Sequence, residues 1–153
     1  MELVNLKKSQ IGKCGELLVQ YRLLMSGIES AHLTTDSGID LVAYSPRNKE
    51  PLTIQVKSNK KPKPGGGGTG KDALDWWIPD DNPADLAAFT DLSTSRVWLM
   101  RPKEVAALAQ QHSSGRYHLY MYVDPTAKPR TKNLAHVYEF EKYLLENRVH
   151  EFF

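Results

Sequence analysis

The stretch from Gly38 to Lys57, GIDLVAYSPRNKEPLTIQVK, predicts a hairpin of two apolar strands joined by a polar turn. Side chains two residues apart on a strand point to the same face, so we expect Gln55 and Lys57 to share one face and Val56 to occupy the other. Closing the hairpin brings Asp40, at the start of the first strand, near Gln55 and Lys57. The alternative is a surface hairpin with scattered polar residues.

A helix is expected upstream, from Ser9 to Ser26, with Ser9 as its N-cap and Gly27 in the left-handed position after its end. Glu16 lies beside the predicted core face; the alternative is a glutamate that faces solvent. Two glycines, Gly12 and Gly15, indicate that a strand or a phosphate backbone approaches the helix closely, because each costs about 1 kcal/mol relative to alanine. The predicted buried face repeats at steps of three and four residues: Ile11, Cys14, Leu18, Tyr21 and Met25, widened by Leu17 and Leu24.

Three segments together resemble the PD-(D/E)xK nuclease superfamily, and within it the small endonucleases related to archaeal Holliday junction resolvases. They are G-x-x-G-E on the helix, the acid Asp40 before apolar residues, and I-Q-V-K on the second strand. The resemblance covers about Ser9 to Ser58 and implies an α/β restriction-endonuclease-like core, a central mixed β-sheet flanked by helices. Two positions depart from the pattern: Ile39 stands where the superfamily has proline, and Gln55 where it has the second acid.

The resemblance also implies roles for single residues. Lys57 would be the catalytic lysine, acting with Glu16, Asp40 and Gln55. Mg²⁺ (or Mn²⁺) prefers oxygen donors, polarises a phosphate and lowers the pKa of a bound water. Because Gln55 is uncharged, metal affinity should fall unless Glu16 or Asp36 compensates; Asp36 is otherwise a turn residue. The expected metal ligands are Glu16, Asp40, Gln55 and the Val56 carbonyl.

The 153 residues predict a single domain, 1–153, with a net charge of only +2. A Gly/Lys/Pro-rich segment at 59–72 is expected to be a flexible loop within this domain. Basic residues after the second strand of the hairpin favour contact with a DNA backbone, although a solvated lysine-rich loop is the alternative. The expected contact residues are Lys60, Lys61, Lys63 and, from a second basic loop at 124–133, Arg130.

The rest of the chain predicts further strands and two helices. The strands are expected at 73–78, 85–90, 96–101 and 116–123, and the helices from Pro102 to near Gly115 and from His136 to Arg148. Trp76 and Trp77 fall on opposite faces of one strand, so one is expected in the core and the other at the cleft or against a base. Phe152 and Phe153 are expected in the core or in a subunit contact.

These features predict a metal-dependent endonuclease that hydrolyses DNA phosphodiester bonds, with branched or junction DNA among its substrates and, by resemblance, a homodimeric state. The alternative, favoured by Gln55, is a nucleic-acid-binding module or accessory subunit that keeps the fold without cleavage. No apolar stretch is long enough for a membrane span, and a signal-peptide pattern is missing. A single cysteine, Cys14, is expected to be a buried small hydrophobe, which fits a cytoplasmic protein.

Overall fold

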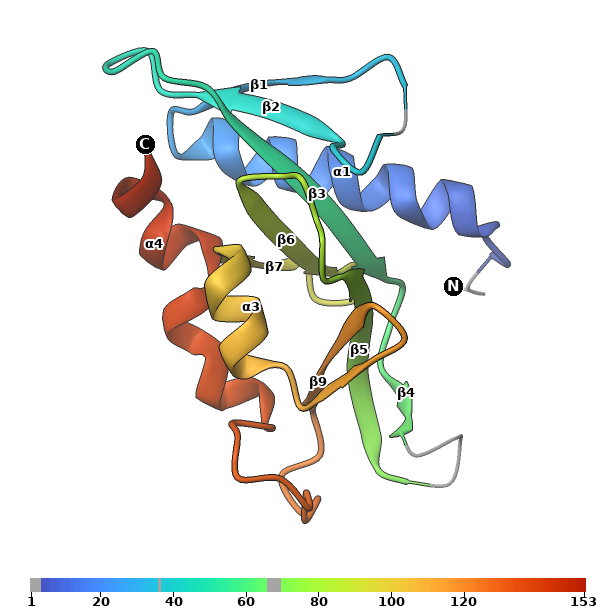
Figure 1. The fold of residues 1–153 in the computed structure, drawn as a ribbon. Helices are drawn as coiled ribbons and strands as arrows, with labels where there is room; N and C mark the ends of the chain where they lie inside the picture. Colours follow the sequence, from blue (N-terminus) through green and yellow to red (C-terminus); the bar gives the residue numbers. More distant parts are fainter. Residues whose placement is uncertain (1–3, 36, 66–69) are drawn as a thin grey trace.

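The computed structural model describes residues 4–35, 37–65 and 70–153, and Asp36 lies outside them. Within these residues, one sheet, sheet A, has the strand order β1-β2-β3-β6-β7. Its strands β3 and β6 run parallel and the other neighbouring pairs run antiparallel. Sheet A is therefore the mixed sheet that the sequence predicts (Figure 1). Its strands are β1 (Glu29–His32), β2 (Leu41–Tyr44), β3 (Leu52–Asn59), β6 (Leu86–Asp91) and β7 (Arg96–Met100).

A second sheet, sheet B, is antiparallel and has the order β4-β5-β9-β8 in the described part of the chain. Because β4 pairs with the start of β5, part of the segment expected as a loop at 59–72 is strand; residues 66–69 of that segment lie outside the described ranges. The strands are β4 (Lys63–Pro64), β5 (Asp72–Pro79), β8 (Gln111–Ser113) and β9 (Arg116–Tyr122).

Two of the predicted helices differ in extent from those observed. The helix that begins at Pro102 is α3 (Pro102–Leu108), and strand β8 follows it. The segment expected as one helix from His136 is divided into a 3-10 helix, η1 (Val137–Tyr143), and α4 (Leu145–Phe152). The division falls at Leu144, whose extended backbone forms a β-bridge with Trp98 of β7. Pairing with sheet A thus overrides the helical pattern at this residue.

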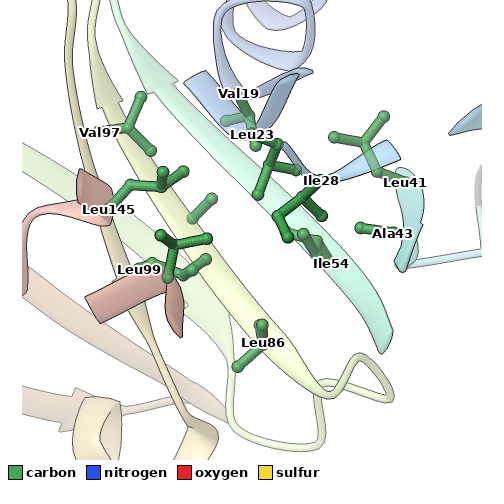
Figure 2. Close-up of a cluster of buried hydrophobic side chains, with 12 residues drawn as sticks. Val19, Leu23, Ile28, Leu41, Ala43, Ile54, Leu86, Val97, Leu99 and Leu145 are labelled. Atoms are coloured by element: carbon green, nitrogen blue, oxygen red, sulfur yellow. The ribbon is translucent and has the colours of Figure 1, made fainter. Parts of the chain in front are cut away.

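The first hydrophobic core lies between one face of sheet A and the helices α1 (Lys8–Met25) and α4 (Figure 2). Phe152 and Phe153 pack against this core, in agreement with their predicted burial. Its buried members come from both helices and from four strands, and they include Val19, Leu23, Leu41, Ile54, Leu86, Val97, Leu99 and Leu145.

The second core lies on the other face of sheet A, against sheet B, α3 and η1. Trp76 belongs to this core and is 3% exposed, as expected for one of the two neighbouring tryptophans. Strand β6 serves both cores, since Leu86 and Ala88 enter the first while Ala87 and Phe89 enter the second. All six residues of β6 are buried.

The predicted buried face of α1 is wrong for most of its residues, although Leu18 packs against the first core. The residues buried on this helix are Gly15, Val19 and Leu23. Cys14, expected in the core, is exposed. The N-cap is Lys7 and not Ser9. Gly27 has φ 81°, so the predicted left-handed position after the helix is confirmed. The predicted core residues that prove strongly exposed are Leu17, Tyr21, Leu24 and Met25.

Gly15 explains which face of α1 is buried. A Cβ atom built on Gly15 would overlap Ser58 Oγ of β3, and it would lie 2.8 Å from Ser58 Cβ and 3.1 Å from Thr90 Oγ1 of β6. The helix backbone at Gly15 therefore lies directly on β3 and β6 of sheet A. This confirms the expected close approach of a strand. Gly12, by contrast, has none of the described atoms within 4 Å of such a Cβ.

The described residues include no helix that is both long and apolar enough to cross a membrane.

Replacing Gly15 and Gly12 by alanine should have opposite effects on stability. Gly15→Ala forces α1 away from β3 and should lower the free energy of unfolding by about 1–3 kcal/mol through overpacking. Gly12→Ala, the matched control, fills open space and should raise it by about 1 kcal/mol, because alanine favours the helix. Urea denaturation measures both values. Equal changes in the two variants would contradict the close contact.

Candidate active site

Strands β2 and β3 separate at Leu41, and Asp40 occupies the point of separation. The antiparallel register ends with Leu41 opposite Ile54. The Asp40 backbone N–H donates to the Ile54 carbonyl at 2.9 Å, and Asp40 Oδ2 accepts the Val56 N–H at 2.7 Å. This charge-assisted bond satisfies a β3 amide that lies beyond the paired part of β2. The carboxylate is thus anchored on the I-Q-V-K segment.

Gln55 and Lys57 leave β3 from the same face. Ile54 and Val56 pack into the first core, on the side of α1. Alternation along the strand directs Gln55 and Lys57 to the opposite face, where the adjacent residues of β6 belong to the second core. Val56 therefore keeps its side chain in the first core while its amide holds Asp40.

Gln55 carries an unpaired oxygen at this position. The residue is only 7% exposed, and its Oε1 atom has no hydrogen-bond partner among the described residues. Buried polar atoms are nearly always paired, with protein, water or a bound ion. An amide oxygen next in sequence to the residue that holds the Asp40 carboxylate is suitable as a ligand of a hard cation such as Mg²⁺. The oxygen atoms of the Gln55 amide and the Asp40 carboxylate thus suit the metal ion that the resemblance implies.

Glu16 lies on the α1 side of the sheet and already has partners. Its Oε1 atom is 3.2 Å from His32 Nδ1 on β1 and 3.4 Å from Lys13 Nζ. His32 pairs with Leu41, the residue after Asp40. Within the described ranges, no three His, Cys, Asp or Glu side chains lie close enough together to hold a metal ion. The structure therefore does not bring Glu16, His32 and Asp40 into one ligand set.

Lys57 lines a cleft of about 580 Å³ at the end of β3. The walls are the end of β3, the first turns of α1, and Asp75 and Trp77 of β5. Several ammonium groups around one concave surface create a positive potential that attracts phosphate. The lysines that line the cleft are Lys8, Lys57, Lys60, Lys61 and Lys63.

Three of the four residues predicted to contact a DNA backbone line this cleft: Lys60, Lys61 and Lys63. Lys60 Nζ donates to the Val4 carbonyl at 2.7 Å, and Lys63 Nζ lies 3.5 Å from Asp75 Oδ1. Arg130 is not among the described lining residues; it belongs to the loop between β9 and η1, drawn in orange to red in Figure 1. Lys8 joins the cleft from α1, a contribution that sequence spacing did not reveal.

Asp75 and His118 form a second polar pair at the cleft that the sequence analysis missed. Asp75 Oδ2 lies 2.9 Å from His118 Nε2 on the neighbouring strand β9. The hydrogen bond with His118, together with the positive charge of Lys63, holds the pKa of Asp75 below its usual value although burial opposes the shift. The two residues are far apart in the sequence, and only the pairing of β5 with β9 brings them together.

The mixed sheet whose hairpin opens at an acid, with a helix across one face, has the restriction-endonuclease-like architecture that the sequence resemblance implied. One similar solved structure is the bacterial homing endonuclease I-Ssp6803I, with a TM-score of 0.60 and 18% identity over 95% of this chain and 90% of that chain. Another is Hjc, a Holliday junction resolvase of Archaeoglobus fulgidus, with a TM-score of 0.49 and 13% identity over 71% and 82% of the two chains. No protein-family model and no curated protein matches the chain. At 18% identity, the likeness to the homing endonuclease establishes the fold alone.

The anchoring role of Asp40 is testable by two substitutions. Asp40→Ala leaves the Val56 N–H without its acceptor and should lower the free energy of unfolding by about 1–3 kcal/mol. Asp40→Asn keeps a side-chain oxygen at the same place and should cost less. Urea denaturation measures the stability, and NMR measures hydrogen exchange of the Val56 amide, which should accelerate in the alanine variant. Equal stability and exchange in the two variants would argue against the anchor.

The Asp75–His118 pair predicts a pH-dependent contribution to stability. Because folding lowers the pKa of Asp75, its contribution is complete above the unfolded pKa of about 3.9 and is lost as the pH falls through the lower folded value. The melting temperature of Asp75→Asn should therefore lie below that of the wild type at pH 7, and the gap should close towards pH 2. Asp81→Asn, which removes an exposed carboxylate after β5, is the control. A gap that is constant with pH would contradict the pairing.

Proposed function

We propose that the protein is a metal-dependent endonuclease that hydrolyses phosphodiester bonds in DNA. One arrangement carries this proposal: the Asp40 carboxylate anchored on β3, the buried unpaired Oε1 atom of Gln55 nearby on the strand, and Lys57 opening into a lysine-lined cleft. Oxygen ligands and an ammonium beside a phosphate-binding surface are the groups that metal-assisted phosphodiester hydrolysis requires.

Asp40, Gln55, the Val56 carbonyl and Glu16 are the proposed ligands of Mg²⁺ or Mn²⁺. When bound, the ion supplies Lewis acidity and lowers the pKa of a coordinated water. Asp40, which precedes β2, provides the charged oxygen, and Gln55 on β3 adds a neutral one. Glu16 is proposed to complete the set from the α1 side by exchanging its contacts with His32 and Lys13 for the ion.

Lys57 is proposed to orient the attacking water or to offset the charge that develops on the phosphate. Lys60, Lys61 and Lys63 would bind phosphates along the cleft, and Arg130 would bind one farther along the backbone. Such contacts fix the position of DNA without reading its sequence. Cleavage of branched or junction DNA and action as a homodimer belong to the same proposal.

A second candidate function is nucleic-acid binding without cleavage, either alone or as an accessory subunit. Gln55 favours it, because an amide in place of a carboxylate removes one negative charge from the metal site. The lysine-lined cleft serves this function equally well, so activity measurements must separate the two candidates.

Nicking of supercoiled plasmid and cleavage of four-way junctions, each with Mg²⁺ or Mn²⁺, test the proposed activity. Lys57→Ala should lower the cleavage rate about 10²- to 10³-fold, the typical effect of removing one group that stabilises developing charge. Asp40→Asn should abolish cleavage at nearly unchanged stability. Lys103→Ala is the matched control, since it removes an exposed lysine from α3 outside the cleft.

Gln55→Glu restores a second acid and should lower the metal concentration needed for half-maximal cleavage. Binding of DNA without cleavage by any of these proteins, with either metal, would support the second candidate. Cleavage that survives both Lys57→Ala and Asp40→Asn would place the active site elsewhere.

A further inference from the structure

A row of aromatic rings runs from the wall of the cleft across the face of sheet B that is turned away from the second core. Leu119 and Met121 of β9 point into that core, so the residues that alternate with them, His118, Tyr120 and Tyr122, point to the opposite face. Successive ring centres along the row are 4.1, 5.6, 5.6, 6.2 and 5.3 Å apart. The members of this aromatic row are Trp77, His118, Tyr120, Tyr122, His136 and Tyr138.

Trp77 is the member of the row that lines the cleft. Its indole stacks on the ring of His118 with an angle of 1° between the planes. The His118 ring is fixed in turn, because its Nε2 lies 2.9 Å from Asp75 and its Nδ1 lies 3.1 Å from Gln111. The Arg116 guanidinium carbon lies 5.2 Å from the centre of the Trp77 ring. An oriented indole loses little conformational entropy when a planar ligand binds.

Trp77 is 36% exposed, whereas its neighbour Trp76 is buried in the second core. At the other end of the row, Tyr138 is also exposed. The rings between these two ends are less accessible, since 15% of the His118 side chain and 13% of the His136 side chain are exposed. The aromatic surface open to solvent beside the charged cleft is therefore that of Trp77, and its exposure indicates a binding function more than a packing function. The alternative is that Trp77 and His118 form a cross-strand pair whose stacking only stabilises the pairing of β5 with β9.

The charges around Trp77 indicate the chemistry of the partner. Lys57, Lys61 and Lys63 line the same cleft, and Arg116 lies over the indole. Surfaces that bind single strands combine a positive groove for the backbone with aromatic rings on which successive bases stack. A base within a duplex is covered by its neighbours, so only an unpaired base offers its face to Trp77.

We propose that the aromatic row binds the unpaired bases of a single strand, with Trp77 as the first stacking position beside the cleft. This inference rests on the proposed function and specifies its substrate: DNA with an unpaired segment next to the phosphate that is cut. A fully paired duplex would contact the lysines of the cleft, but its bases would not stack on the aromatic row.

Binding of two oligonucleotides of equal length and charge tests the row: a run of thymidines, and the same backbone without bases. In EDTA, which prevents cleavage, wild-type protein should bind the thymidine strand more tightly, and binding should quench tryptophan fluorescence. Trp77→Ala should weaken thymidine binding about 5- to 150-fold and leave the abasic strand unaffected. Trp77→Phe should keep most of the affinity and lose the quenching, because Trp76 and Trp98 are buried.

Tyr44→Ala is the control for loss of an exposed aromatic residue, since Tyr44 lies on β2 and outside the row; it should bind both strands as the wild type does. Equal affinity of the wild type for the two strands, or no quenching by thymidines, would overturn the proposal even if Trp77→Ala fails to fold. Plasmid nicking separates this result from the proposed function. Nicking by a protein that binds the two strands equally would contradict the role of the aromatic row alone. Tighter binding of the thymidine strand without nicking would contradict the proposed nuclease activity alone.

Discussion

The hydrogen bond from the Val56 amide to the Asp40 carboxylate is the interaction on which the candidate site depends. The Asp40 side chain here accepts the hydrogen bond that a neighbouring strand would otherwise accept, because the register of β2 with β3 ends at Ile54, two residues before Val56. The second half of β3 can therefore leave its neighbour and form the wall of a cleft without a buried unpaired amide. The same bond holds the Asp40 carboxylate against the segment of β3 that carries Gln55 and Lys57. Structure and chemistry thus rely on one carboxylate.

The contact of α1 with sheet A fixes the other side of the site. Gly15 allows the helix backbone to lie on Ser58 and Thr90, and this places the first turns of the helix at the mouth of the cleft. Lys8 reaches the cleft as a result, and Glu16 is held against His32 on the edge strand. The lysines of the cleft therefore come from α1 and from residues 57–63, which are far apart in the sequence. Their relative position depends on Gly15, a residue without a side chain.

The hairpin, the shared face of Gln55 and Lys57, and the burial of one of the two neighbouring tryptophans could all be predicted, because each depends on alternation along a strand. Which tryptophan is buried was left open, and the structure buries Trp76. The buried face of α1 could not, because apolar residues occupy more than one face and periodicity does not say which face meets the sheet. Leu17 and Tyr21 remain exposed for this reason. The break at Leu144 and the Asp75–His118 pair escaped prediction because both arise from pairing between segments distant in the chain.

Strand β6 is shared by both hydrophobic cores, with alternate side chains in each and every residue buried. Loss of either core would expose one apolar face of this strand to water. The free energy of that exposure would destabilise the remaining core. The layers on the two sides of sheet A should consequently melt together in one cooperative transition. The slowest-exchanging amide protons of the molecule are then those of β6, and a partly unfolded form that keeps the cleft while losing the helical layer should not accumulate.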